Sequence, residues 1–271
     1  MKKLLTATTA LVAFAAVASA QAADLTPPQV FKAPPPAPWY DWTGFYIGAN
    51  GGYSWGQSST TITAPGLAAF SGSQNVDGWL GGGQIGYNWQ FNHNWVLGLE
   101  ADIQGTGQEG STGLPTVITV PTIAILALPT TTTTGSFSQS LPWFGTVRGR
   151  LGVEPADRLL LYVTGGLAYG EVQSSTSVTT TTGFAGAPPL ATTTAAANAS
   201  NIQVGWTAGA GLEWAFTGRW SAKLEYLYVD LGTFTNTFAG LPPAYPTLTA
   251  SSHFTDNIFR VGINYNFGGP R

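Results

Sequence analysis

The sequence predicts an all-β fold, an eight-stranded antiparallel up-and-down transmembrane β-barrel, from three observations. Eight segments alternate apolar residues with small or polar ones at a period of two, which is the pattern of strands with one apolar face. The connections between these segments are alternately short and long. Only 8% of residues are charged, against about 25% in a typical soluble domain, whereas glycine and aromatic residues are plentiful. This composition suits a lipid-facing surface around a tightly packed interior.

The first 20 residues predict a signal peptide. A basic pair at 2–3 precedes an apolar run over 4–17, and Ala18-Ser19-Ala20 supplies the small residues of a cleavage site, which could also follow Ala22 or Ala23. The alternative is a transmembrane anchor, but the run is shorter than the ~20 residues that a spanning helix needs. No later segment is apolar over such a length, so a helical inner-membrane protein is excluded.

Residues 21–40 predict an extended periplasmic segment. This stretch contains Pro27-Pro28, Pro34-Pro35-Pro36 and Pro38. Proline-rich chains favour a polyproline-like conformation, and proline cannot donate a hydrogen bond to a strand ladder. The barrel is therefore expected over residues 41–267, with a short tail at 268–271.

The eight strands are expected where the alternation runs. Their marker residues span 45–55, 79–91, 95–103, 143–153, 159–169, 204–216, 220–228 and 259–267. The first covers ten residue steps, or roughly 33 Å at ~3.3 Å per residue. A strand of that length tilted by about 40° rises about 25 Å, which matches the apolar band of an outer-membrane barrel.

The connections predict the orientation. Short turns are expected at 92–94, 155–158 and 217–219, and long loops near 57–77, 108–141, 173–203 and 235–252. In outer-membrane barrels the short turns are periplasmic and the long loops are extracellular, so both termini should be periplasmic. The long loops are rich in threonine and are expected to be polar and mobile. They would contact host or phage molecules, or would only shield the surface.

Aromatic residues lie where the apolar band should end, as in the girdles of membrane barrels. The expected girdle residues are Phe91, Trp95, Phe216, Trp220 and Phe267 at one rim and Trp55, Trp79, Trp143, Tyr169, Trp206 and Tyr228 at the other. The alternative fold is a water-soluble β-sandwich, whose outward face would carry ordinary surface charge. Here the second face is mostly Gly, Asn, Gln, Ser and Thr, which favours the barrel, with outer-membrane lipid and lipopolysaccharide around it.

The few charges in the strands share one face. Because side chains alternate between the two faces of a strand, the charged residues expected to face the lumen are Glu100, Asp102, Arg148, Arg150, Glu213, Lys223, Glu225 and Arg260. Glu213 and Lys223 lie symmetrically about a turn, so they should be cross-strand neighbours. The interior of an eight-stranded barrel is just wide enough for side chains to fill it, and buried charges are costly unless paired. This network is either a polar column that conducts ions or a plug, and its charge balance favours the plug.

Few residues suggest chemistry. There is no cysteine, no basic run after the signal peptide that would bind nucleic acid, and no residue spacing typical of a metal or cofactor site. His93 is expected in a solvated turn. His253 lies near Ser251, Ser252 and Asp256, which would suit a lipid-modifying enzyme only if nucleophile and base met with an orienting group. Proximity in the sequence does not build such a triad, so no enzymatic activity is expected.

Three segments resemble a family of small alphaproteobacterial outer-membrane β-barrel surface proteins, the porin-family or OmpA-like β-barrel type. They are YDWTGFYIG at 40–48 with GGYSWG at 51–56, GGGQIGYNW at 81–89, and RVGINYNF at 260–267. The resemblance covers about 40–267 and implies a surface antigen with roles in envelope integrity and limited solute passage, without catalytic residues. It also implies that the barrel-assembly machinery reads Tyr265 and Phe267. Family members usually end on the aromatic residue, whereas four residues follow it here.

The resulting hypothesis is a structural, surface-exposed outer-membrane protein whose lumen is plugged by paired charges. The alternative is a narrow porin-like channel for small solutes.

Overall fold

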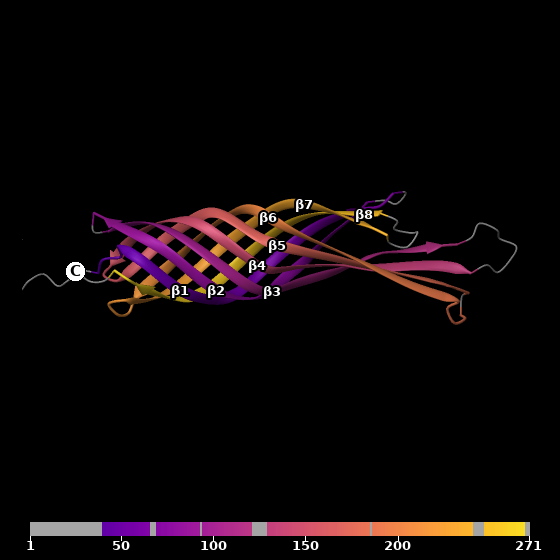
Figure 1. Ribbon diagram of the computed structural model, residues 1–271, viewed down its shortest axis with the longest axis horizontal. Helices are drawn as coiled ribbons and strands as arrows, with labels where there is room; N and C mark the ends of the chain where they lie inside the picture. The colour runs from indigo at the N-terminus through magenta and orange to yellow at the C-terminus, as the bar shows by residue number, and fades with distance from the viewer. Residues whose placement is uncertain are drawn as a thin grey trace, which may run out of the picture. The chain divides into compact units, whose positions relative to one another are not determined.

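The computed structural model describes residues 40–65, 69–92, 94–120, 129–184, 186–240 and 247–268. They form eight antiparallel strands in a closed barrel, in which each strand pairs with its sequence neighbours and β8 pairs with β1 (Figure 1). The predicted fold class is confirmed. No helix among these residues is long and apolar enough to cross a membrane. The predicted signal peptide, nearly all of the Pro-rich segment, His93 and residues 269–271 lie outside the described residues.

The strands are longer than the sequence alternation predicted. Their bounds are β1 Gly44–Thr63, β2 Phe70–Phe91, β3 Trp95–Thr119, β4 Thr130–Ala156, β5 Leu159–Gly183, β6 Ala191–Ala215, β7 Trp220–Ala239 and β8 Thr247–Asn266. The prediction of long loops near 57–77, 108–141, 173–203 and 235–252 is therefore wrong for most of those residues, which continue the strands. Threonine is β-branched and fits an exposed sheet, so threonine-rich runs form strand here rather than loop.

The pattern of alternation changes along the strands, and this explains the error. In the half with the short turns, apolar side chains such as Leu99 and Val261 point outward and are exposed, while polar side chains are buried inside. Further along, apolar side chains such as Phe137 and Phe254 are fully buried inside, and serine and threonine point outward. The first half is built to face lipid, and the second half is built to face water. The sequence prediction followed only the first pattern.

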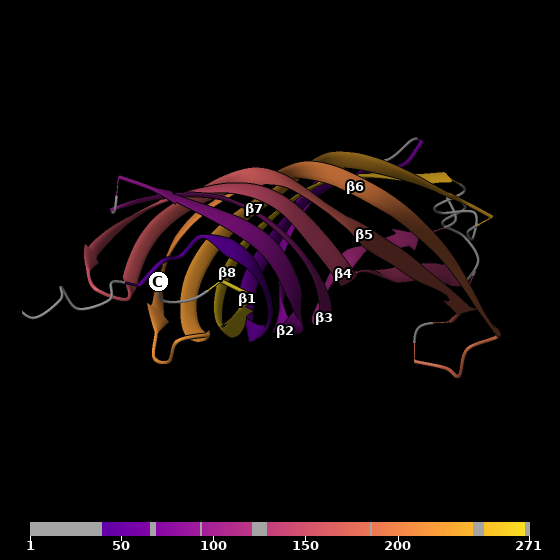
Figure 2. The ribbon, with the colours of Figure 1, turned by 60° about the vertical axis from the view of Figure 1, so that its left-hand side comes forward.

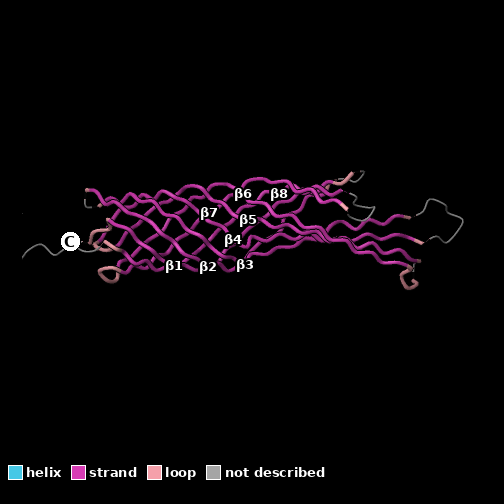
Figure 3. Tube along the Cα trace, in the orientation of Figure 1, coloured by secondary structure: helices cyan, strands magenta, loops and turns pink. Residues whose placement is uncertain are grey.

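The far half also divides into two sheets. Pairing of β6 with β7 stops at Trp206–Asp230, and pairing of β2 with β3 stops at Asp77–Glu109. Beyond these points β7-β8-β1-β2 form one sheet and β3-β4-β5-β6 form another, and the strands separate into two groups (Figure 3). Between the sheets lies an apolar cluster of Ile62, Leu114, Phe137, Val178, Phe238, Leu248 and Ala250. In water, strand edges can be hydrated, so closure is not required there, and the far half adopts sandwich packing.

The short turns and the C-terminal end of β8 lie at the opposite end of the barrel from this sandwich (Figure 2). The interior of the turn end is closed by an apolar layer that includes Tyr40 and Trp42, which are 1% and 2% exposed. The backbone amide of Tyr40 donates to the Asp157 carboxylate at 3.3 Å, and that of Trp42 to the Gln90 side chain at 2.7 Å. The assignment of Tyr40 to an extended tether is thus wrong. Burial raises the pKa of the Tyr40 hydroxyl to about 12.

Candidate functional site

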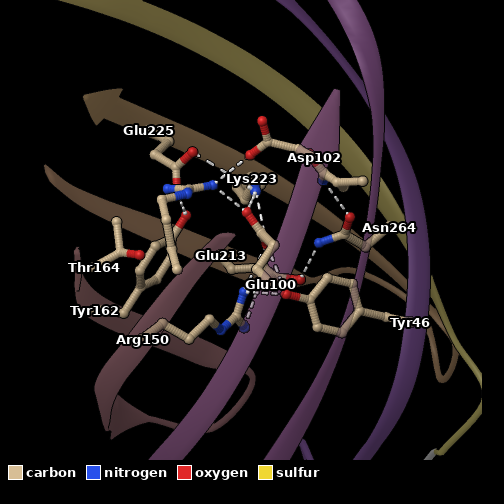
Figure 4. Close-up of polar contacts among 12 residues, drawn as sticks. Tyr46, Glu100, Asp102, Arg150, Tyr162, Thr164, Glu213, Lys223, Glu225 and Asn264 are labelled. Atoms are coloured by element: carbon tan, nitrogen blue, oxygen red, sulfur yellow. Dashed lines mark hydrogen bonds and ion pairs between the residues drawn. The ribbon is translucent and has the colours of Figure 1, made fainter. Parts of the chain in front are cut away.

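The eight predicted lumen charges converge in one buried network above the Tyr40–Trp42 layer. Each is 5% exposed or less, and together they carry four negative and four positive charges. The acids come from β3, β6 and β7 and the bases from β4, β7 and β8, so side chains from opposite walls meet in the middle of the lumen (Figure 4). The alternation of side chains along the strands predicted that these residues lie on the inner face. The closure of the barrel brings them into contact.

Arg148 and Arg260 form the centre of the network. Both guanidinium groups lie 2.9 Å from the Asp102 carboxylate. They also bridge to Glu225, at 3.1 Å from Arg148 and 2.6 Å from Arg260. Arg148 pairs in addition with Glu100, its register partner on β3. Two bases held between three acids leave each charge with several partners, which is what a buried ion pair needs to offset its desolvation.

Lys223 and Glu213 take partners from across the lumen. They are register partners on β7 and β6. The Lys223 ammonium, however, lies 2.9 and 3.0 Å from the two carboxylate oxygens of Glu100. Glu213 instead accepts from Arg150 at 2.9 Å and from Asn264 at 2.7 Å. The pairing therefore ties distant strands together and does not merely reinforce neighbouring ones.

Two tyrosines that the sequence analysis did not single out complete the network. The Arg150 guanidinium lies between the rings of Tyr46 and Tyr162, 5.0 and 4.9 Å from their centroids, in cation–π contact. Their hydroxyls donate to Glu100 at 2.7 Å and Glu225 at 2.9 Å.

Glycines make room for both tyrosine rings. A Cβ on Gly86 would collide with the Tyr46 hydroxyl, and one on Gly211 would collide with that of Tyr162. The available sequence signal was an aromatic residue at an inner, otherwise small or polar position of a strand, without a charged residue on the inner face of that strand. Spacing alone does not disclose such a pairing.

Amide side chains adjoin the charges, and an apolar cluster follows toward the sandwich. The Gln84 side chain links Asn50, at 2.7 Å, to Asn264, which contacts Glu213 in turn. β2 is thereby connected to a network to which all the other strands contribute. Toward the sandwich, an apolar cluster surrounds Gln108 and Asp256, whose side chains are hydrogen-bonded to each other at 2.5 Å. Its members include Val76, Leu80, Leu141, Phe144, Leu227, Phe254 and Ile258.

The candidate residues for lipid chemistry are divided between two faces of β8. His253 is on the outer face, where its Nδ1 lies 3.1 Å from the Thr233 hydroxyl and its Nε2 lies 3.7 Å from Asp230. Ser251 shares the outer face with His253, but its hydroxyl lies 3.4 Å from the Thr235 hydroxyl. Ser252 and Asp256 are buried on the inner face. Among the described residues, no group of three His, Cys, Asp or Glu side chains is placed to hold a metal ion. Among the contacts of the described residues, none joins His253 to a serine hydroxyl.

The predicted girdle residues all point away from the interior, and none of the eleven is buried. Several form edge-to-face or tilted pairs, such as Trp143 with Tyr169 at 6.2 Å and Trp206 with Tyr228 at 5.4 Å. At the end of β8, the Tyr265 ring lies 5.2 Å from both Trp220 and Phe267.

Comparison with known proteins agrees with this architecture. Residues 8–267 match the family model described as outer membrane protein beta-barrel domain. The chain belongs to this family. It is a bacterial outer-membrane β-barrel, and the family predicted from the sequence motifs is confirmed.

Individual relatives of this outer-membrane β-barrel come from alphaproteobacteria. The chain is 35% identical over 256 residues to the 31 kDa outer-membrane immunogenic protein of Brucella melitensis, covering 92% of this chain and 94% of that protein. It is 31% identical over 198 residues to the 22 kDa outer membrane protein of Rhizobium leguminosarum bv. viciae, covering 72% and 67%. The crystal structure of OprG from Pseudomonas aeruginosa is 13% identical, with a TM-score of 0.45, covering 84% of this chain and 97% of that one.

Proposed function

We propose that the protein is a structural, surface-exposed scaffold of the outer membrane, with a lumen plugged by its ion-paired charges. It would contribute to envelope integrity through the barrel and to surface interactions through the sandwich. The observation that carries this proposal is the buried network itself. Four acids and four bases, each 5% exposed or less, fill the cross-section with mutual ion pairs.

The layers on either side of the network support a plug. The Tyr40–Trp42 layer lies on the turn side, and the cluster around Phe144 and Phe254 lies on the sandwich side. A hydrated ion would have to displace buried apolar side chains in both layers. It would also have to break ion pairs that hold strands from opposite walls.

The alternative is a narrow channel for small solutes, and one observation favours it. Some buried polar atoms of the lumen have no hydrogen-bond partner among the described protein atoms, including Arg260 Nη1, Gln104 Oε1 and both polar side-chain atoms of Asn88. Such atoms attract water. A chain of water through them would still meet the two apolar layers, so we favour the plug.

Conductance separates the two functions. We expect the intact protein, reconstituted in planar bilayers, to show no stable current steps in 1 M salt, because ion-paired and apolar side chains occupy the lumen. The folded state would be confirmed on the same sample by its heat-dependent gel mobility. Regular ohmic current steps from this folded protein would refute the plugged lumen and support the channel.

The surroundings of the barrel follow from the same proposal. The outward aromatic residues would lie at the two lipid interfaces, with lipopolysaccharide beside the rim that includes Trp55 and Trp79. The barrel-assembly machinery would read Tyr265 and Phe267 at the end of β8. Host or phage molecules would meet the sandwich, in keeping with the naming of Brucella relatives as immunogenic outer-membrane proteins. No chemistry of its own is proposed for the protein.

The proposed orientation, with both termini periplasmic, predicts where an inserted epitope tag is accessible. A tag after Gly186, between β5 and β6, should bind antibody on intact cells, because this connection lies at the sandwich end. A tag after Gly218, in the turn between β6 and β7, should bind antibody only after the outer membrane is permeabilised. Flow cytometry of both strains makes the measurement. The reverse result would mean that the short turns are extracellular and the sandwich is periplasmic.

A further inference from the structure

The outer face of the β3–β6 sheet is hollowed just beyond Trp143 and Tyr169, where the barrel leaves its apolar band. The hollow has a volume of about 920 Å³ and is lined by β2 to β6. Pockets that bind small molecules have volumes of about 300–1,000 Å³. This groove is therefore large enough for a ligand, and it belongs to the water-facing half of the protein.

Register places polar side chains in two adjacent rows across this groove. Glu109, Ser140 and Gln173 are successive cross-strand partners on β3, β4 and β5. Ser138, Ser175 and Asn198 form the next row on β4, β5 and β6. The Ser138 and Ser175 hydroxyls are 3.0 Å apart. Side chains this short leave the sheet surface concave, and each serine hydroxyl can both donate and accept a hydrogen bond.

Glu171 hydrogen-bonds to side chains at the edge of the groove nearest Trp143. One carboxylate oxygen accepts from Ser200 at 2.6 Å and from Gln173 at 3.0 Å. The other accepts from the Trp143 indole at 2.9 Å. A carboxylate bound by three donors orients the polar side chains around it before any ligand arrives, which lowers the entropic cost of binding.

The charges of the groove restrict the class of ligand. Among the described residues that line it, no side chain is positively charged, while Glu109 lines it and Glu171 borders it. Phosphate and carboxylate groups are normally bound by arginine, lysine or helix N-termini, so an anionic ligand is disfavoured. The lining is also too polar for an acyl chain. A ligand dense in neutral hydroxyl groups matches these serine, asparagine and glutamine side chains.

We propose that this groove binds a neutral oligosaccharide of an external surface. The lipopolysaccharide of the surrounding membrane carries anionic groups on the sugars nearest the lipid, which the acidic border would repel. The inference deepens the proposed surface role and rests on it only for access to the ligand. In detergent solution, binding is measured whichever end of the barrel faces outward, so failure of the inference and failure of the orientation are distinguishable.

The experiment is saturation-transfer NMR on the intact protein in detergent, with maltotetraose, chitotetraose and mannotetraose as probes. At least one probe should receive saturation and be displaced by excess of itself. The variant S138V/S175V replaces a hydroxyl pair in the groove with methyl groups, and Asn198→Ala removes an amide from the same row. Each should weaken binding by about tenfold, because buried polar groups of the ligand lose their partners.

A matched control comes from the other sheet. T235V/S251V removes a similar outward hydroxyl pair, 3.4 Å apart on β7 and β8, and should leave binding unchanged. Heat-dependent gel mobility checks that each variant folds. The proposal is overturned if no probe binds, if the groove and control variants bind equally, or if only the anionic core oligosaccharide of lipopolysaccharide binds.

Discussion

Replacing Arg148 with methionine is expected to destabilise the folded barrel by about 3–5 kcal/mol. The methionine has a similar length, but Glu100, Asp102 and Glu225 lose a shared counter-ion inside the lumen. Removing one member of a buried ion network leaves uncompensated charge in a place that water does not reach. The free energy of unfolding is measured by urea titration in lipid vesicles, with tryptophan fluorescence as the signal.

Two further variants distinguish charge from packing. R148M/E225Q restores the balance of the interior and should recover part of the loss, whereas a loss caused by packing alone would grow. Arg158→Met is the surface control, since that arginine pairs with Asp157 at 3.6 Å and its side chain is 44% exposed. It should cost less than about 1 kcal/mol. An R148M protein as stable as the parent would refute the structural role of the network.

An arginine placed on the outer face should have opposite consequences at two positions of β3. At Leu99, 67% exposed in the middle of the apolar band, it should cost about 2–4 kcal/mol, because the charge enters the hydrocarbon region. At Ser111, twelve residues along on the same face, it should change stability by no more than about 0.5 kcal/mol, because that face meets water. The same titration in vesicles measures both variants.

This pair tests the inversion of the alternation directly. Both substitutions add the same side chain to the same strand and the same face, so the comparison reports mainly on the surroundings of the two positions. Equal costs at the two positions would mean that the apolar band continues through the sandwich. The residues that were predicted as long loops would then form strands that face lipid, and not strands that face water.

Much of the barrel could be predicted from the sequence, because period-two alternation assigns each strand residue to one of two faces. This is how Arg148, Glu225 and the other lumen charges were placed inside. The extent of the strands could not be predicted in the same way. Where apolar residues change from the outer to the inner face, the alternation on the outer face ends. The pattern therefore predicts the end of the strand there, although its backbone continues. In the threonine runs, both faces are polar and the alternation disappears.

The partners within the network were also beyond the sequence. Glu213 and Lys223 are register partners, as their symmetry about the turn implies, yet each bonds a residue from elsewhere in the barrel. Which side chains meet across a lumen depends on strand tilt and stagger, and a single sequence does not specify these. The Tyr40–Trp42 layer was missed for a similar reason, because its contacts come from residues far away in the chain.

Thiol labelling tests the central claim. This claim is that the lumen of the barrel excludes water, whereas the outer face of the sandwich is in contact with water. The chain has no cysteine, so single substitutions report individually. Ser251→Cys on the outer face of the sandwich should react quickly with a charged methanethiosulfonate reagent in nanodiscs. Val261→Cys in the apolar band should not react. Ser54→Cys, Thr146→Cys and Ser221→Cys, at inner positions that are 0% exposed, should also stay unlabelled while the protein is folded. Labelling of these three at the rate of Ser251→Cys would show a water-filled lumen and contradict the account.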